Sequence, residues 1–166
     1  MIQKTLVLIK PDGVKRNLIG EIINRFEKGG LKVLEMQMLT ASAEILEKHY
    51  PSDEEYLRII GEKSKAAGDQ IDDVVEQGRK IVNALREFMA SGPIVKMILE
   101  GEDGIALARK ITGYTDPSKA DKGSIRGDLG EDSILAANSD GRPVYNLIHA
   151  SGTPEEAETE KALWFS

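Results

Sequence analysis

The chain has 166 residues, of which 40% are hydrophobic and 30% charged, and its formal net charge is −6. This length and composition indicate a single soluble globular domain with a hydrophobic core. No apolar run reaches membrane-spanning length and the N-terminus lacks a signal-peptide pattern, so we expect a cytoplasmic protein. The absence of cysteine excludes disulfides and thiolate metal sites, and the acidic charge disfavours a nucleic-acid partner.

Strand and helix patterns alternate in the first fifty residues. The apolar run at Thr5–Ile9 is typical of a strand covered on both faces, and Pro11 and Gly13 then break it. An apolar stripe from Leu18 to Phe26 indicates a helix that ends at two glycines. The predicted elements are a strand at 5–9, a helix from 18 to Gly29 and Gly30, a strand at 31–39 and a helix from Ser42 to Tyr50.

The rest of the chain begins with a charged, helix-rich segment at 51–88, in which 74–89 reads as one amphipathic helix. Thr153 can cap the last helix, with Pro154 at its first position. The remaining predictions are a strand at 94–99, a helix at 103–111, mostly loop at 115–137, a strand at 144–148 and a helix at 154–163.

This order of elements predicts a ferredoxin-like βαββαβ fold of the α+β class. We expect an antiparallel four-stranded sheet with helices on one face. Two segments are extra to that core, a helical insertion at about 51–88 and an extended loop at about 131–142. The absence of linkers and repeats predicts one domain over residues 1–166.

His149 is the main candidate for a catalytic group. It ends an apolar run and begins a polar turn, and an imidazole near neutral pH can offer an unprotonated nitrogen as a nucleophile. The alternative is a structural histidine, and His49, on a helix beside Tyr50, fits that alternative better. Glu160 on the last helix is either a solvated side chain or a support that orients the imidazole.

Three basic residues are candidates for binding a phosphate. Lys10 precedes a turn fixed by Pro and Gly, and Arg126 lies between two glycines in a predicted loop. Arg109 lies on a predicted helix, where a solvated role is the alternative; for Arg126 the alternative is an ion pair with Asp128. No glycine-rich phosphate loop is present, so side chains would hold the phosphates. If the phosphates belong to a nucleotide, a divalent cation, Mg²⁺, would arrive bound to it.

Several motifs in this order make the chain resemble the nucleoside diphosphate kinase family along almost its whole length. The motifs that carry the resemblance are Thr5–Arg16, Ile19–Glu27, Ser91–Pro93, Leu99–Gly101, Ser124–Asp128 and Asn146–Ser151.

The resemblance implies a ping-pong transfer of the γ-phosphoryl group from a nucleoside triphosphate to a nucleoside diphosphate through a phosphohistidine at His149. It also implies a homo-oligomer, a hexamer or a tetramer. The implied phosphate contacts are Lys10, Arg109, Thr115 and Arg126, and the implied sugar contacts are Lys10 and Asn146. Tyr50 would lie beside the phosphate and the histidine, and Ser151 and Glu160 would support the histidine.

The chain departs from the family pattern in the segment at 51–88, which lacks the usual Phe-Phe pair. An aromatic of that pair normally stacks on the base, and Tyr56, Leu57 or Ile60 could replace it. The family also has an acid where Gly152 stands. An alternative is therefore a catalytically weak or inactive nucleotide-binding relative with a sensing or structural role. A generic ferredoxin-like interaction domain would explain the fold but not the converging cations.

Overall fold

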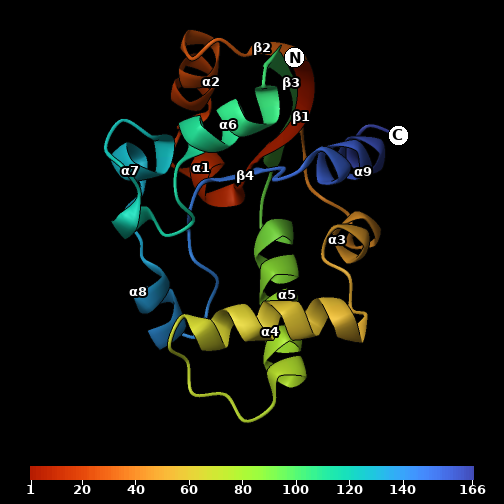
Figure 1. The fold of residues 1–166 in the computed structure, drawn as a ribbon, viewed down its shortest axis with the longest axis vertical. Helices are drawn as coiled ribbons and strands as arrows, with labels where there is room; N and C mark the ends of the chain where they lie inside the picture. Colours follow the sequence, from red (N-terminus) through yellow and green to blue (C-terminus); the bar gives the residue numbers. More distant parts are fainter.

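A computed structural model describes residues 1–166 and contains a four-stranded sheet with helices on both faces (Figure 1). Every strand pairs antiparallel with its neighbours, and the order is β2-β3-β1-β4. The predicted antiparallel four-stranded sheet is therefore confirmed. The strands are β1 (Ile2–Ile9), β2 (Lys32–Leu39), β3 (Ile94–Glu102) and β4 (Ile148–Ala150).

β1 lies between β3 and β4, and its side chains fill the core on both sides of the sheet. Leu6 and Leu8 belong to one buried cluster, whereas Val7 and Ile9 belong to the other. Successive side chains of a strand point to opposite faces, so a continuous apolar run is what a strand buried on both faces requires. The prediction for this strand is confirmed.

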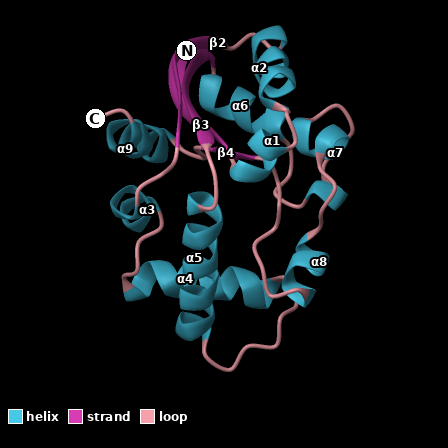
Figure 2. Ribbon diagram, turned by 180° about the vertical axis from the view of Figure 1, so that it is seen from behind, coloured by secondary structure: helices cyan, strands magenta, loops and turns pink.

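Helices cover both faces of the sheet, so the expectation of one covered face is wrong. Ile22, Phe26 and Ala108 pack under the first face. Leu46 and Trp164 are buried on the second face, because α3 and the C-terminal helix lie there (Figure 2). The helices of the first face are α2 (Ile19–Lys28) and α6 (Gly104–Thr112), and those of the second are α3 (Ala43–His49) and α9 (Pro154–Trp164).

The predicted helical insertion is confirmed as a pair of crossing helices, α4 (Glu54–Ala66) and α5 (Val74–Ala90), which extends away from the sheet (Figure 1). Two glycines allow this close crossing. A Cβ at Gly61 would lie 1.8 Å from the carbonyl oxygen of Val74, and one at Gly78 would lie 1.9 Å from that of Leu57. Larger side chains at either position would force the helices apart. No helix is both long and apolar enough to cross a membrane.

The prediction of mostly loop at 115–137 is wrong, because three short helices lie there or begin there. Each α-helix there is started by a serine whose hydroxyl accepts a backbone hydrogen bond, Ser124 from Gly127 and Ser133 from Ala136. Caps can set short helices that carry little hydrophobic periodicity. The short helices are η1 (Pro117–Lys119), α7 (Ile125–Leu129) and α8 (Ile134–Ser139), and α8 lies inside the segment predicted as an extended loop at 131–142.

The predicted strand at 144–148 is also wrong, because β4 begins at Ile148. Leu147 has a φ of 70°, in the left-handed region, where a strand cannot continue. Its carbonyl accepts from the backbone N–H of Lys10 at 2.8 Å, and its own N–H donates to Asp12 Oδ2 at 3.0 Å. These bonds fix the turn that precedes His149 against the end of β1, where the short helix α1 (Pro11–Lys15) begins.

Candidate active site

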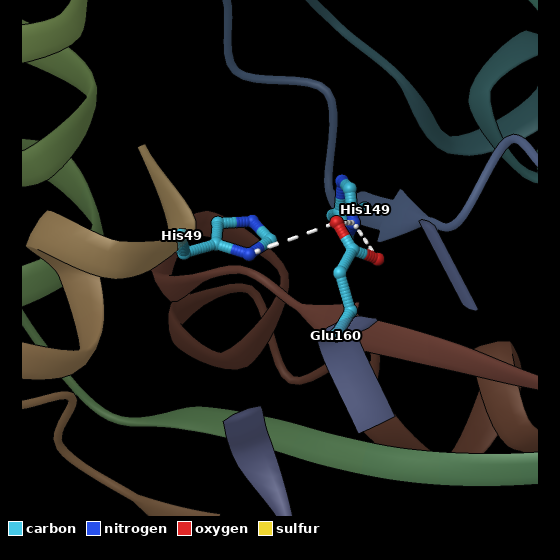
Figure 3. A group of neighbouring side chains, drawn as sticks. All are labelled: His49, His149 and Glu160. Carbon is cyan, nitrogen blue, oxygen red and sulfur yellow. Dashed lines mark hydrogen bonds and ion pairs between the residues drawn. The ribbon is translucent and has the colours of Figure 1, made fainter. Parts of the chain in front are cut away.

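His149 lies in the middle of β4, opposite Leu8 of β1, rather than after the end of a strand. Its Nε2 is 2.9 Å from both carboxylate oxygens of Glu160 on α9 (Figure 3). The imidazole is 23% exposed, so one edge is held from behind while another remains accessible. The structure thus joins the two residues that the sequence proposed as nucleophile and support.

The hydrogen bond to Glu160 selects the tautomer of His149. An ionised carboxylate only accepts hydrogen bonds, so Nε2 carries the proton of a neutral ring. Nδ1 then holds the lone pair, and Figure 3 shows this nitrogen pointing away from Glu160. A neutral imidazole with a free Nδ1 is the form that can attack an electrophile.

Glu160 is held in turn by Ser151, whose hydroxyl donates to Oε2 at 2.5 Å. Burial alone would raise the pKa of the Glu160 carboxyl, but the hydrogen bonds from His149 and Ser151, together with the electrostatic effect of the two nearby imidazoles, outweigh it and lower that pKa. The carboxylate is therefore charged at neutral pH. It can offset the positive charge that develops on the ring when Nδ1 forms a bond.

His49 is a site residue that the sequence analysis missed. Its ring centroid is 4.8 Å from that of His149, in an edge-to-face arrangement, and its Nδ1 is 3.7 Å from Glu160 Oε1 (Figure 3). Burial, followed by the nearby His149, lowers the pKa of His49 to about 3, so its ring is neutral. Only the tertiary fold brings residues 49 and 149 together, and the local sequence around His49 carries no signal of it.

His49, His149 and Glu160 are residue types that bind metal ions, and their donor atoms all lie within 4.8 Å of one another. Each is already used in a hydrogen bond. Glu160 accepts from His149 and Ser151, and His49 Nδ1 accepts from the indole N–H of Trp164 at 3.3 Å. The arrangement therefore holds the ring of His149 in one orientation.

Lys10 is buried at the end of β1, with 7% of its surface exposed. Its ammonium donates to Asn146 Oδ1 at 2.8 Å. Burial, and then the charge of Arg126, lowers the pKa of Lys10 to about 8. A buried ammonium with a single amide partner is poised for an incoming anion.

Arg126 is buried as well, and it binds the segment that carries His149. Its guanidinium donates to the carbonyl oxygens of Asn146, Gly113 and Ile148. Burial, and then the charge of Arg109, lowers its pKa to about 10. The expected alternative, an ion pair with Asp128, is absent, because Asp128 pairs with Arg25 at 2.6 Å.

Arg109 on α6 and Thr115 after it complete the group of predicted phosphate contacts. The Arg109 guanidinium reaches the carbonyl oxygen of Ala150 at 3.4 Å, next to His149. The carbonyl of Thr115 accepts from Asn146 Nδ2 at 3.0 Å, so the amide of Asn146 links Thr115 to Lys10. These contacts gather three cations around residues 146–150.

Tyr50 reaches His149 through another side chain, that of His49. Its ring packs edge-on against His49, with centroids 4.6 Å apart. Burial raises the pKa of its hydroxyl far above the usual value, so the phenol is neutral.

Asp12 is a structural residue of the site that the sequence analysis does not name. Its carboxylate accepts a hydrogen bond from the N–H of Leu147. Its position in the Lys-Pro-Asp-Gly motif is the signal that could have indicated this role.

His149 is held by a carboxylate and lies on the segment that Lys10, Arg126 and Arg109 contact. A histidine with cations close by suits the transfer of a phosphoryl group, and this class of enzyme is what the fold and the site define. The comparisons with known proteins make this specific. The sequence model described as nucleoside diphosphate kinase matches residues 3–58 and 73–166. The chain belongs to the nucleoside diphosphate kinase family.

Full-length relatives agree with this assignment. A nucleoside diphosphate kinase from Pyrobaculum aerophilum is 47% identical over 174 residues, covering 99% of this chain and 95% of that protein. The crystal structure of an NDP kinase from the same organism has a TM-score of 0.94 at 44% identity, over 100% of this chain and 97% of the other. A Borrelia burgdorferi enzyme, solved with vanadate and ADP as a transition-state mimic, has a TM-score of 0.81 at 35% identity, over 99% and 88%.

Proposed function

We propose that this nucleoside diphosphate kinase works by a ping-pong mechanism in which Nδ1 of His149 carries the phosphoryl group. The observation that supports the proposal is the hydrogen bond between Nε2 and Glu160, which leaves Nδ1 unprotonated on the accessible edge of the ring. The full-length kinases that resemble the chain at 35–47% identity support the same activity.

In the first step the lone pair of Nδ1 attacks the γ-phosphorus of a nucleoside triphosphate. The P–N bond forms while the bond to the β,γ-bridging oxygen breaks, and the electron pair leaves on the nucleoside diphosphate. The Nε2 proton stays on the ring, and Glu160 balances the imidazolium charge. In the second step a terminal oxygen of another nucleoside diphosphate attacks the phosphorus, and the P–N bond breaks.

The basic side chains stabilise the negative charge that spreads over the transferring group, which is the main requirement of phosphoryl transfer. Lys10, Arg109 and Arg126 supply positive charge, and the Thr115 hydroxyl supplies a donor. Lys10 and Asn146 would also contact the sugar. The hydrogen bonds of Arg126 to three carbonyl oxygens hold its guanidinium rigidly while leaving donors for a phosphate.

Mg²⁺ would enter with the nucleotide, held chiefly by phosphate oxygens. The donor set fits this role, because the one group of three metal-ligating side chains, around His149, is occupied by its own hydrogen bonds. When bound, the ion would neutralise phosphate charge. Lys10, Arg109 and Arg126 would supply the rest of the positive charge.

We also propose that the chain forms a homo-oligomer, a hexamer or a tetramer. β2 lies at the edge of the sheet, and Met36 and Met38 on it are 54% and 52% exposed. An edge strand with exposed apolar side chains is suited to pairing with a second copy. Light scattering on a sizing column would give the mass, and a monomer at micromolar concentration would contradict this.

The test of the mechanism is labelling with ATP that carries ³²P at the γ-position. We expect the wild-type chain to take up a label that is lost in acid and kept in base, and that passes to added GDP. His149→Ala should take up none while keeping its fold by circular dichroism. Lys4→Ala, at an exposed position of β1, is the control and should take up label like the wild type. Full exchange by His149→Ala would overturn the proposal. Nucleotide binding without label in the wild type would favour the inactive relative.

A further inference from the structure

A lysine of β3, Lys96, lies in the same row of the sheet as His149. Lys96 pairs with Leu8 of β1, and Leu8 pairs on its other side with His149 of β4. Side chains that lie directly opposite one another on neighbouring strands point to the same face of the sheet. Lys96 and His149 therefore both point toward the face that α3 and α9 cover, and two strand spacings of about 4.8 Å each separate them.

The surroundings of Lys96 on this face are apolar. Leu8 beside it and Ile94, two positions earlier on β3, belong to the buried cluster of the second face, and 9% of Lys96 is exposed. Burial lowers the pKa of its ammonium, although the charge of Glu35 opposes this. An apolar side chain would avoid the cost of burying a charge, but it could not make the contacts that the ammonium makes.

Those contacts are with the C-terminal end of α9. The ammonium of Lys96 donates a hydrogen bond to the main-chain carbonyl oxygen of Trp164, the last residue of the helix, and it lies 4.4 Å from the centroid of the Phe165 ring. The last carbonyls of a helix have no partner within the helix and carry the negative end of its dipole. A cation is also attracted to the face of an aromatic ring. Lys96 therefore holds this helix end through a hydrogen bond, through charge and through Phe165.

One helical turn earlier, α9 is held at a second point by His149. Both carboxylate oxygens of Glu160 lie 2.9 Å from Nε2 of His149 (Figure 3). Glu160 and Trp164 are four residues apart, which is about 6 Å along a helix. The helix thus spans the row of the sheet that contains Lys96, Leu8 and His149, with one anchor at each end of that row.

Trp164 connects the two anchors through its side chain. Its indole N–H donates to Nδ1 of His49 at 3.3 Å, and this nitrogen lies 3.7 Å from Oε1 of Glu160. Trp164 is 1% exposed and belongs to the buried cluster of the second face. A shift of the end of α9 would therefore move the indole, and with it the neighbours of His149.

We propose that Lys96 is a positioning residue for phosphoryl transfer, because it holds α9 where Glu160 meets Nε2 of His149. Without the ammonium the end of α9 can shift, and Glu160 spends part of its time away from the ring. The proton of the neutral ring then divides between the two nitrogens, so fewer rings have the lone pair on Nδ1. The inference rests on the proposed function, since it concerns the tautomer of His149 that attacks the γ-phosphorus.

The first test is Lys96→Met, which keeps the length of the side chain and removes the donor. We expect phosphoenzyme formation at saturating ATP to slow about tenfold, a modest share of what misplaced catalytic groups can cost. The ATP concentration that gives half the maximal rate should change less than about twofold, because Lys96 is not among the proposed phosphate contacts. Lys96→Arg, which keeps a cation with donors, should recover most of the rate.

Lys4→Met is the matched control, because it removes an exposed lysine from β1 on the same face of the sheet, and it should leave both quantities unchanged. A wild-type rate in Lys96→Met overturns the inference. So does a higher half-saturating ATP concentration with an unchanged maximal rate, since Lys96 would then act on binding.

A second readout follows the tautomer of His149 without turnover. Imidazole ¹⁵N chemical shifts, measured without nucleotide at pH 8, should show the proton of His149 on Nε2 in the wild type and shared between the two nitrogens in Lys96→Met. Phe165→Leu, which removes the ring over the ammonium and leaves Lys96 in place, should shift the signals in the same direction by less. Unchanged shifts in both variants overturn the inference. If the wild type takes no label from ATP, the phosphohistidine mechanism fails separately, and the tautomer still decides the role of Lys96.

Discussion

Lys10→Met should make the protein more stable and nearly inactive. Lys10 is 7% exposed, and burial, followed by the charge of Arg126, lowers the pKa of its ammonium from 10.5 to about 8. Each pKa unit corresponds to about 1.4 kcal/mol, so holding the charged form in the folded protein costs about 3 kcal/mol at pH 7. The variant also loses the hydrogen bond to Asn146, about 1 kcal/mol. The net expectation is a gain of about 2 kcal/mol in the free energy of unfolding.

The pH dependence gives this prediction its sign. Between about pH 8 and pH 10.5 the unfolded chain binds a proton at Lys10 that the folded chain does not. The free energy of unfolding of the wild type therefore rises with pH across this window. Lys10→Met lacks this titrating group, so its free energy of unfolding lacks this rise. The difference between the two proteins should be largest at or below pH 7 and small near pH 10.5.

Urea unfolding at pH 7 and pH 10, without nucleotide, measures both effects. Lys4→Met, which replaces an exposed lysine on the same strand, is the control and should change the unfolding free energy by less than about 0.5 kcal/mol. Exchange activity of Lys10→Met should fall sharply if Lys10 contacts a phosphate as proposed. A Lys10→Met protein that is less stable than the wild type at pH 7 would refute the reasoning, since burial of the charge would then carry no net cost.

Three further predictions follow from other contacts. Glu160→Gln keeps an acceptor for the histidine but removes the charge that offsets the imidazolium, so phosphoenzyme formation in stopped flow should slow about 100-fold. Gly78→Ala should lower the free energy of unfolding by about 1–3 kcal/mol, because its Cβ would meet the carbonyl oxygen of Leu57 on α4 at 1.9 Å. Gly20→Ala is the contrasting case, since a Cβ there meets open space in a helix, and it should raise the free energy of unfolding by about 0.5–1 kcal/mol. His49→Phe should make stability less sensitive to acid between pH 6.5 and pH 4, since the folded chain resists protonation of His49 and the unfolded chain does not.

The sequence predicted the elements whose signal is local. The apolar run of β1 and the stripe of α2 came from periodicity, and the cap at Thr153 marked the start of α9. The short helices at 125–129 and 134–139 were missed because they depend on serine caps rather than on an apolar stripe. The prediction of a strand at 144–148 is wrong because Leu147 has a left-handed backbone, which is set by hydrogen bonds to residues more than a hundred positions away.

The residues of the site also fall into two groups, those with a local sequence signal and those that only the fold brings together. Lys10, Arg126 and His149 lie in recognisable motifs, so their chemistry could be proposed before the fold was known. His49 could not, because its contact with His149 joins two segments one hundred residues apart, and nothing in its surroundings distinguishes it from a surface histidine. A cavity of about 460 Å³ between α4, α5 and α8 could not be predicted from the sequence either, since it depends on how these helices meet.

The register of one short strand pair places His149, the proposed nucleophile, relative to the buried ammonium of Lys10. Leu8 lies opposite His149 and Ile9 opposite Ile148, and the next backbone bond joins Lys10 to Leu147. Because side chains alternate along a strand, a slip of one residue would turn the imidazole to the other face of the sheet, away from Glu160. The bonds of Asp12 and Lys10 to the turn before β4 prevent that slip. In the proposed mechanism the Lys-Pro-Asp-Gly motif would therefore act twice, through the ammonium of Lys10 and through the alignment of the strand that carries His149.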